Sequence, residues 1–409
     1  MNGPLSGIKV VELATYVAAP VVGRMLADLG AEVIKVEAPA GDNWRNTGVS
    51  YLPRFTYDEN PVFDIYNTGK KHISLNLKAP EGMDAMHRLL GEADVFLTNT
   101  RPQSLKKLGL DYDTLKEKYP RLVYAIVLGY GAKGPDKDKP AFDTTAFWSR
   151  GGFLRDMGPL NEHYTPVSQP SSVGDTATGY LLLAEISTAL FNRTRTGKGD
   201  YVRSTLYHNG IFCFGTMAII TQKPFGRKYP ASRVDLGAPA GSYECADGEW
   251  VYFTLANAAV HTPKVCKMIG RPELMEEEFF QPANRWKNRQ KIYDIFKAAF
   301  LSKPSTYWLA EAEKEDVTFV RMAHFSDISE DPQAWANDYV EHVTFRNGNT
   351  DVMPASPIEM ESCTPPKTVP APPNGTHTAE ILAQLGYSPE QIEAMLASGA
   401  AVAAKEEAK

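Results

Sequence analysis

A short segment in the middle of the chain places a carboxylate among unusually small neighbours. Residues 171–190 are SSVGDTATGYLLLAEISTAL, and Asp175 comes just before an apolar run that predicts a buried helix. An aspartate there can accept hydrogen bonds from the free N–H groups of the first helical turn. The small side chains from Gly174 to Gly179 would also let a bulky ligand approach the carboxylate closely. The residues alone leave both roles open.

Basic residues of a second segment, TNTRPQSLKKLGLDYDTL (98–115), are also placed where they could bind a ligand. Asn99, Thr100 and Arg101 follow a predicted strand, and Lys106 and Lys107 come one or two helical turns later. Ligands of open α/β sheets bind at the carboxyl ends of the strands, where Arg and Lys can hold phosphates. A solvated basic start of a helix explains the same residues equally well.

Several other kinds of chemistry lack sequence support. No G-x-S-x-G, HExxH or P-loop pattern occurs, and the eight histidines are isolated from one another. Among them, we single out His208 for its position after Asp175. The four cysteines, Cys213, Cys245, Cys266 and Cys363, show no CxxC spacing. This predicts reduced thiols in a cytoplasmic protein, with neither a disulfide framework nor a metal site.

The elements that must position these residues follow an alternating order. Predicted strands cover residues 9–13, 32–37, 72–77, 95–99 and 122–131, with helices at 23–30, 81–93 and 112–119 between them. Such alternation indicates a mostly parallel sheet covered on both faces. The opening unit is Rossmann-like, and Glu37 ends its second strand, where a dinucleotide-binding protein holds a ribose. The first turn, ATYVAAP, lacks the glycine fingerprint, so we expect no NAD.

Beyond the helix that follows Asp175, we expect a turn at 194–200 and a helical stretch over 201–220. The composition changes near residue 222, and Asp247-Gly248 predicts a hairpin. The predicted fold is α/β: a large Rossmann-like open parallel-sheet domain from 1–224 and 331–409, with a smaller α+β domain at 225–330. Residues 400–409 are expected to form a frayed tail.

Charge and hydropathy exclude two classes of partner. The net charge is −6, with 43 Lys plus Arg against 49 Asp plus Glu, so no global basic field favours nucleic acid. No run of 18 apolar residues occurs, and the N-terminal segment MNGPLSGIKVVEL lacks the pattern of a signal peptide. We therefore expect neither membrane insertion nor secretion.

Five ordered segments together carry a resemblance to a known family. They are LSGIKVVEL with LADLGAEVIKVEAPAGD, LTNTRP with LGLDYDTLKEKYPRLVYAIVLGYGAKGP, VGDTATG, TGKGDYVRSTL and HTAEILAQLGYSPEQI. In these segments the chain resembles the family III CoA-transferases from about residue 5 to residue 395. The resemblance implies that Asp175 is the nucleophile, and that the helix N-terminus favours its ionised form at neutral pH.

The same resemblance implies which residues bind coenzyme A. These residues are Val17, Ala18, Ala38, Leu75, Asn76, Leu77, Lys78, Asn99, Thr100, Arg101, Lys107, Pro140, Ala141, Phe142 and Asp143. Two departures stand out, because the oxalate-using branch has glutamine and arginine where this chain has Val17 and Ala38. The segment LGAPAG (236–241) also replaces the four-glycine loop of that branch.

The resemblance extends to the substrates and the assembly. Asp143 matches an acidic active-site position, although a structural N-cap is the alternative, and Phe147 and Trp148 could wall an apolar acyl pocket. The related α-methylacyl-CoA racemases carry a His-Asp pair where this chain has Phe142-Asp143, which favours a transferase.

The segments GYGAKGPDKDKPAFDTTAFWSRGG and EKYPRLVYA most resemble the enzymes that activate 2-hydroxy acids in amino-acid fermentation. Oxalate, carnitine and fatty acids remain alternative acceptors. The family implies an interlocked homodimer that takes an acyl-CoA donor and a carboxylic acid acceptor.

Overall fold

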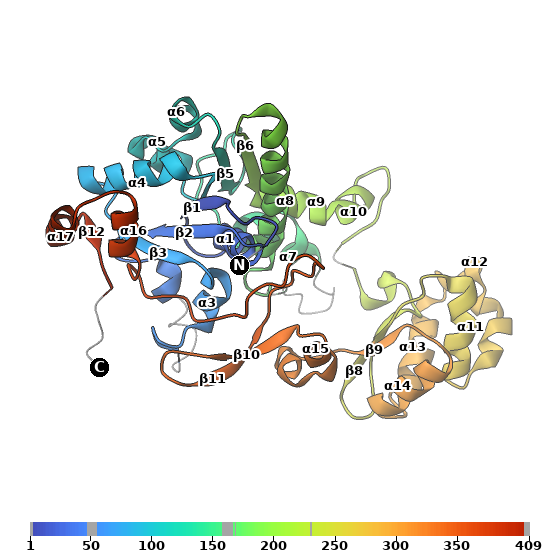
Figure 1. Ribbon diagram of the computed structural model, residues 1–409. Coiled ribbons are helices and arrows are strands. Elements are labelled where there is room, and N and C mark those ends of the chain that lie inside the picture. The colour runs from blue at the N-terminus through green and yellow to red at the C-terminus, as the bar shows by residue number, and fades with distance from the viewer. Residues whose placement is uncertain (1–2, 47–54, 158–166, 168, 230, 405–409) are drawn as a thin grey trace. The chain divides into compact units, whose positions relative to one another are not determined.

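The computed structural model describes residues 3–46, 55–157, 167, 169–229 and 231–404 (Figure 1). The chain divides into two compact units. One is formed by residues 1–152, 169–218 and 331–409, and the other by residues 153–168 and 219–330. None of the described helices is long and apolar enough to span a bilayer.

The first unit is built on a seven-stranded sheet with the order β12-β3-β2-β1-β4-β5-β6. All neighbouring pairs are parallel except β12, which runs antiparallel to β3. The α/β class and the mostly parallel sheet are therefore confirmed. The strands are β1 (Lys9–Leu13), β2 (Glu32–Glu37), β3 (Lys71–Leu75), β4 (Val95–Thr98), β5 (Val123–Leu128), β6 (Tyr201–Thr205) and β12 (Ala401–Val402).

The strand order places a topological switch point between β1 and β4. From β1 the chain moves one way through β2 and β3, and from β4 it moves the other way through β5 and β6. The loops that leave the carboxyl ends of β1 and β4 therefore diverge, which opens a crevice where open α/β sheets bind their ligands.

Helices and one hairpin complete this unit. The helices are α1 (Pro20–Asp28), α3 (Pro61–Asn67), α4 (Pro80–Glu92), α5 (Pro102–Leu108), α6 (Tyr112–Lys118), α8 (Val173–Thr196), α9 (Leu206–Cys213), α15 (Pro332–Ala336), α16 (Thr378–Gln384) and α17 (Pro389–Ser398), with a π-helical segment η1 (Asp143–Ser149). The hairpin strands are β10 (Val340–Thr344) and β11 (Thr350–Pro354), and α10 (Gly215–Ile220) runs across the boundary between the units. The sequence predicted neither α3 nor this hairpin.

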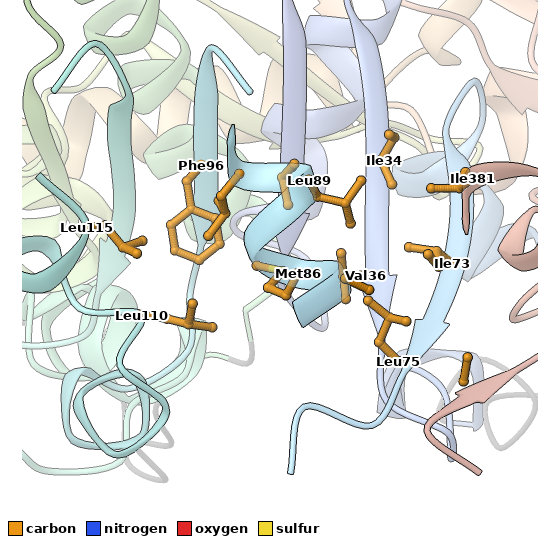
Figure 2. Close-up of a cluster of buried hydrophobic side chains, with 14 of the residues drawn as sticks. Ile34, Val36, Ile73, Leu75, Met86, Leu89, Phe96, Leu110, Leu115 and Ile381 are labelled. Atoms are coloured by element: carbon orange, nitrogen blue, oxygen red, sulfur yellow. The ribbon is translucent and has the colours of Figure 1, made fainter. Parts of the chain in front are cut away.

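One face of the sheet carries a continuous apolar core. Side chains from β2, β3 and β4 meet Met86 and Leu89 of α4, and Leu110, Leu115 and Ile381 close its two sides (Figure 2). Because successive side chains of a strand point to opposite faces, Val11 belongs to this core whereas Val10 faces the other way. There α1 and α8 pack on one another and on the strands.

The second unit has its own small core. Strands β7 (Gly241–Glu244), β8 (Trp250–Phe253) and β9 (Phe319–Arg321) form an antiparallel sheet, and the hairpin predicted around Asp247-Gly248 joins the first two. Stacked rings of Tyr243, Phe253 and Phe300 fill the space beneath the sheet. The helices are α7 (Phe153–Asp156), α11 (Ala258–Met268), α12 (Pro282–Arg285), α13 (Arg289–Phe300) and α14 (Ser305–Lys314), with 3₁₀ turns η2 (Arg233–Leu236), η3 (Pro272–Glu276), η4 (Glu278–Phe280) and η5 (Phe325–Glu330).

Two local predictions are wrong. Residues 201–205 are not helical but form β6, because the β-branched residues of YVRST extend along β5 at the sheet edge. The turn expected at 194–200 starts late, since α8 continues to Thr196 and ends on Gly197 in the left-handed conformation, with φ of 70°. The remaining strand and helix predictions for the first 131 residues are confirmed within three residues at each end.

The C-terminal segment is likewise more ordered than expected. Ala400 and Ala401 are each 1% exposed, Asn76 donates its N–H to the carbonyl of Ala400 at 2.9 Å, and β12 covers the edge of β3. Small apolar side chains allow this close approach, so the prediction of a frayed tail is wrong for residues 400–404 and lies outside the described residues for 405–409.

Removing the edge strand therefore has a predictable cost. Truncation after Gly399 removes the buried alanines and the pairing of β12 with β3, and we expect the free energy of unfolding to fall by about 1–3 kcal/mol. Truncation after Ala404 is the matched control and should leave stability unchanged. Denaturant titration of both chains measures the difference, and equal stability of the two would show that β12 contributes nothing.

Candidate active site

The start of α8 lies at the carboxyl edge of the sheet. Helix α8 leads into β6, and β6 is parallel to β5, so the helix runs opposite to the strands and begins where the strands end. Ser172 precedes the helix in a left-handed conformation with φ of 67° and is buried. Asp175 is the third helical residue, so its predicted place in the first turn is confirmed.

Asp143 opens the π-helical segment η1 and packs against the first turn of α8. Its side chain is 7% exposed and lies against the backbone N–H groups of Ser172, Gly174 and Asp175. Burial raises the pKa of Asp143, and the nearby Trp148 side chain and those N–H groups oppose the rise. The partial positive charge of the helix N-terminus therefore faces Asp143.

Asp175 is in a different electrostatic position from the one expected. Its removal from water raises its pKa to about 7, and the negative charge of Asp143 contributes in the same direction. The N–H groups of the helix start therefore do not hold the pKa of Asp175 low, because Asp143 is the carboxylate that they face, and the carboxylate form of Asp175 is only partly populated at neutral pH. Two neighbouring carboxylates with different surroundings are typical of an active site.

If the carboxylate form of Asp175 reacts, activity must depend on pH. A raised pKa means that the reactive form is lost as the pH falls through about 7, so kcat/KM should rise with pH across that value. Asp143→Asn removes the like charge and should move the inflection to lower pH. The exposed Asp113, paired with Lys116, supplies the control variant Asp113→Asn, which should leave the profile in place. A profile of the wild-type enzyme that is flat from pH 5 to pH 9 would contradict this assignment.

A cavity of about 420 Å³ opens beside Asp175 at the switch point. Its walls come from the loops after β1, β4 and β5 and from the segment before η1. They are formed by Thr15, Tyr16, Ala18, Asn99, Thr100, Arg101, Gln103, Ser104, Val127, Leu128, Gly129, Lys137, Asp138, Lys139, Ala141, Phe142, Asp175 and Leu206. The exposed Arg101, Lys137 and Lys139 give the cavity three cationic side chains.

The loops that form the cavity are tied to one another. Asn99 accepts the N–H of Thr15 at 3.1 Å and donates its side-chain amide to the carbonyl of Thr15 at 2.6 Å. The Thr98 hydroxyl donates to the carbonyl of Leu13 at 2.7 Å. The ends of β1 and β4 are thereby held together, and the amide of Asn99 is used for this bridge.

The structure brings six of the predicted coenzyme A residues to this cavity together with Asp175. They are Ala18, Asn99, Thr100, Arg101, Ala141 and Phe142. Asp143 lies behind the cavity against α8. All of the coenzyme A assignments stay predictions, although the structure gives the position of each residue.

The other predicted residues lie in several surroundings. Leu75 points into the apolar core (Figure 2), and Val17 is buried beside Trp44 and Phe63. Ala38, Lys78, Lys107 and Pro140 are exposed, and Asn76 and Leu77 are half-buried. Phe147 and Trp148 pack on each other and on Phe214, with ring centroids 5.3–5.8 Å apart, in a buried cluster rather than along the cavity wall. His208 is absent from the cavity wall as described.

Sequence reasoning missed Tyr16, Lys137 and Lys139. Tyr16 adopts a left-handed conformation with φ of 63°, and its ring meets the edge of Phe142 at 5.5 Å. The sequence did place all three after predicted strands: Tyr16 follows the first strand and the two lysines follow the fifth. The carboxyl ends of parallel strands lie at the same edge of a sheet, where ligands bind. The two loops leave strands on either side of β4, and only the folded structure brings them to one cavity.

Glu37 has no free carboxylate for a ribose. It accepts hydrogen bonds from Arg45 at 2.7 and 2.9 Å and from the N–H of Asp42 at 2.8 Å, and it lies 2.7 Å from Nδ1 of His72. Burial opposes ionisation, but the bonds from Arg45 and His72 hold the pKa of Glu37 well below its usual range. This carboxylate therefore organises the sheet edge and does not face a nucleotide.

Comparison with known proteins decides the family. The model of CoA-transferase family III matches residues 5–378. The chain belongs to CoA-transferase family III. It is 39% identical to the (R)-2-hydroxy-4-methylpentanoate CoA-transferase of Clostridioides difficile, over 95% of this chain and 97% of that protein. It is 38% identical to the cinnamoyl-CoA:phenyllactate CoA-transferase of Clostridium sporogenes, over 95% of each protein.

The fold of the family III chain agrees with a solved structure. The crystal structure of a CAIB/BAIF family protein from Brucella suis matches with a TM-score of 0.80 and 29% identity, over 94% of this chain and all of that one. CoA-transferases of this family use CoA thioesters as substrates. The cavity with its basic side chains lies at the carboxyl edge of the sheet, where open α/β sheets bind their ligands.

Proposed function

We propose that this family III enzyme transfers coenzyme A from an acyl- or enoyl-CoA to a 2-hydroxy carboxylic acid. The observation that carries the proposal is the position of Asp175 in a cavity that also holds Arg101, Lys137 and Lys139. Coenzyme A is polyanionic, so cations suit its phosphates, and a carboxylate suits its thioester. The similarity to two enzymes named for 2-hydroxy acids supports the acceptor class.

The proposed chemistry conserves the energy of the thioester by keeping the acyl group on carboxylates. The Asp175 carboxylate attacks the thioester carbonyl of the donor and expels CoA thiolate, which leaves a mixed anhydride. The thiolate then attacks the carbonyl of Asp175 and releases the donor acid, which leaves an aspartyl-CoA thioester. The acceptor carboxylate displaces the thiolate to form a second anhydride, and the thiolate attacks the acceptor acyl group and frees Asp175.

The surroundings of Asp175 suit this sequence of steps. A carboxylate that is poorly hydrated is a better nucleophile than a solvated one, and water would hydrolyse either anhydride. The low polarity that raises the pKa of Asp175 to about 7 is the same property that limits water at the anhydride. Asp143, fixed at the start of α8, keeps the first turn of the helix in place.

An acceptor panel tests the substrate class. With cinnamoyl-CoA or a branched 2-hydroxyacyl-CoA as donor, we expect efficient transfer to branched and aromatic 2-hydroxy acids and poor transfer to oxalate, carnitine and fatty acids. Efficient use of only the second group would overturn the 2-hydroxy acid assignment but leave CoA transfer intact. Exchange of the α-proton in deuterated water without transfer would indicate a racemase. Phe142 supplies no titratable group for that reaction.

We further propose that the chain acts in the cytoplasm as a homodimer, interlocked as in the family. Helices α8 and α9 support dimerisation, because they expose large apolar side chains in the first unit. Phe191 is 65% exposed and Phe212 is 83% exposed, and Tyr180 and Leu181 are also exposed, about three turns before Phe191 on α8. Light scattering after gel filtration should give twice the mass of the chain, and a monomer at micromolar concentration would contradict the proposal.

A further inference from the structure

The loop that joins β1 to α1 forms part of the cavity wall. Residues 14–19 contribute Thr15, Tyr16 and Ala18 to the lining. Within this loop Tyr16 has φ of 63°, in the left-handed region that a side chain with a Cβ adopts only when its surroundings impose it. Contacts with the residues beneath the loop must therefore fix the conformation of its backbone.

Four charged side chains are completely buried beneath this loop. Glu12, Lys35, Asp42 and Lys70, named here the buried quartet, each have a side chain with 0% exposure. The Lys35 ammonium lies 2.9 Å from one oxygen of Glu12 and 3.0 Å from Asp42, and the Lys70 ammonium lies 2.8 Å from the other oxygen of Glu12. Two acids and two bases thus form one neutral chain of contacts.

Three members of the buried quartet also bind the backbone of the loop or of the first residue of α1, each at a different point. Lys35 donates to the carbonyl of Ala14 at 2.8 Å. Asp42 accepts the N–H of Tyr16 at 3.1 Å, and the same oxygen accepts the N–H of Trp44 at 2.9 Å. Lys70 donates to the carbonyl of Pro20 at 2.8 Å. The start and the middle of the loop, and the first residue of α1 just after it, are therefore held from below by one ionic network.

The helix after the loop, α1, packs closely against the buried quartet. A Cβ added to Gly23 of α1 would lie 1.9 Å from Oε2 of Glu12, so the helix backbone rests directly on the buried quartet. On the cavity side, the ring of Tyr16 packs between Trp44 at 5.9 Å and Phe142 at 5.5 Å. Any shift of the quartet is thus transmitted to Tyr16 and Phe142, two walls of the cavity.

A buried ion pair adds little net stability compared with apolar residues of the same size, so stability alone does not account for four such charges. We propose that Asp42 and Lys35 are positioning residues for the CoA thioester: they hold the loop 14–19, with Tyr16 in its left-handed conformation, in the shape that binds the ligand. The inference rests on the proposed function, because it takes the cavity to be the CoA site. Asp175 stands on α8, outside the loop.

The test uses a double variant that keeps the buried set neutral. Lys35→Met with Asp42→Asn removes one positive and one negative charge and leaves the Glu12–Lys70 pair intact. The matched control is Arg24→Met with Asp28→Asn, which removes a buried ion pair of 2.8 Å in the same unit; the other hydrogen-bond partners of this pair include the carbonyl of Ile65, Thr368 and Ser356. We expect KM for acyl-CoA to rise by about ten-fold or more in the first variant while kcat changes by about three-fold at most. The control variant should lose thermal stability, but its KM for acyl-CoA should not rise in this way relative to kcat.

Hydrogen exchange supplies a readout that does not depend on activity. The segment 14–20 should be strongly protected in the wild-type enzyme, and its exchange should accelerate in the Lys35→Met, Asp42→Asn variant but not in the control. Fast exchange of this segment in the wild type would overturn the inference even if the variant did not fold. An unchanged KM for acyl-CoA in the Lys35→Met, Asp42→Asn variant would also overturn the inference. An equal loss of kcat in this variant and in the control would overturn it as well. A wild-type enzyme without any CoA transfer would instead overturn the proposed function, whatever the exchange shows.

Discussion

Replacement of Asp175 by alanine is expected to lower the rate of CoA transfer by about 10⁴-fold or more, because the covalent route disappears with the nucleophile. Binding of the acyl-CoA donor should survive, since the cations and the cavity walls remain. Steady-state kinetics with the best donor and acceptor pair measures the loss, and calorimetry measures the affinity for coenzyme A.

Asp175→Asn provides the control for folding. The folded enzyme raises the pKa of Asp175 to about 7 from an ordinary value near 3.8, so the folded state favours the protonated carboxyl. Stability therefore falls as the pH rises from about 4 to 7, and a neutral amide removes this penalty. We expect the asparagine variant to be inactive and yet to melt at the same temperature as the wild type or higher at pH 8. An inactive variant that melts much lower would mean that misfolding explains the loss.

Replacement of Gly174 by alanine is expected to have the second largest effect. A Cβ at this position would lie 2.2 Å from Oδ1 of Asp143 and 2.5 Å from two ring carbons of Phe147, and Phe147 is buried. The first turn of α8 must shift, which should cost about 1–3 kcal/mol of stability. A displacement of about 1 Å at a nucleophile lowers rates by about 10²-fold, so we expect a loss of that size in kcat.

Gly215 supplies the matched control for this prediction. It is also helical and in the same unit, but a Cβ there meets nothing within 4 Å. Gly215→Ala should leave kcat unchanged and leave stability equal or slightly higher. If both glycine variants retain full activity, the close packing of α8 on Asp143 has no catalytic importance.

The sequence was most informative where a pattern is local. The alternating strands and helices of the first 131 residues depend on hydrophobic periodicity, and the structure has them nearly where predicted. Asp175 was found because its small neighbours and the following apolar run are consecutive in the chain. The β6 strand was missed because five residues at a sheet edge carry a weak signal beside a strongly apolar helix, and β12 because its two residues, Ala401 and Val402, are too few to show a pattern.

The parts of the site that were not predicted depend on long-range packing. Tyr16 and Phe142 are 126 positions apart, and only the neighbouring places of their loops bring the rings together. The exchange of electrostatic roles between Asp143 and Asp175 depends on which carboxylate faces the N–H groups of α8, and sequence spacing does not encode that. Likewise, Lys35 lies within β2 and Lys70 directly before β3, and a buried ammonium is unexpected at either position.

The central claim is that one carboxylate carries the acyl group and then coenzyme A between two acids. The most direct test is to incubate the enzyme with acyl-CoA, quench it with hydroxylamine and map the peptides by mass spectrometry. The account predicts an aspartyl hydroxamate at Asp175 that forms only when acyl-CoA is present and disappears when a good acceptor acid is added. A hydroxamate on another side chain, or full transfer activity in an enzyme that never labels at Asp175, would contradict it.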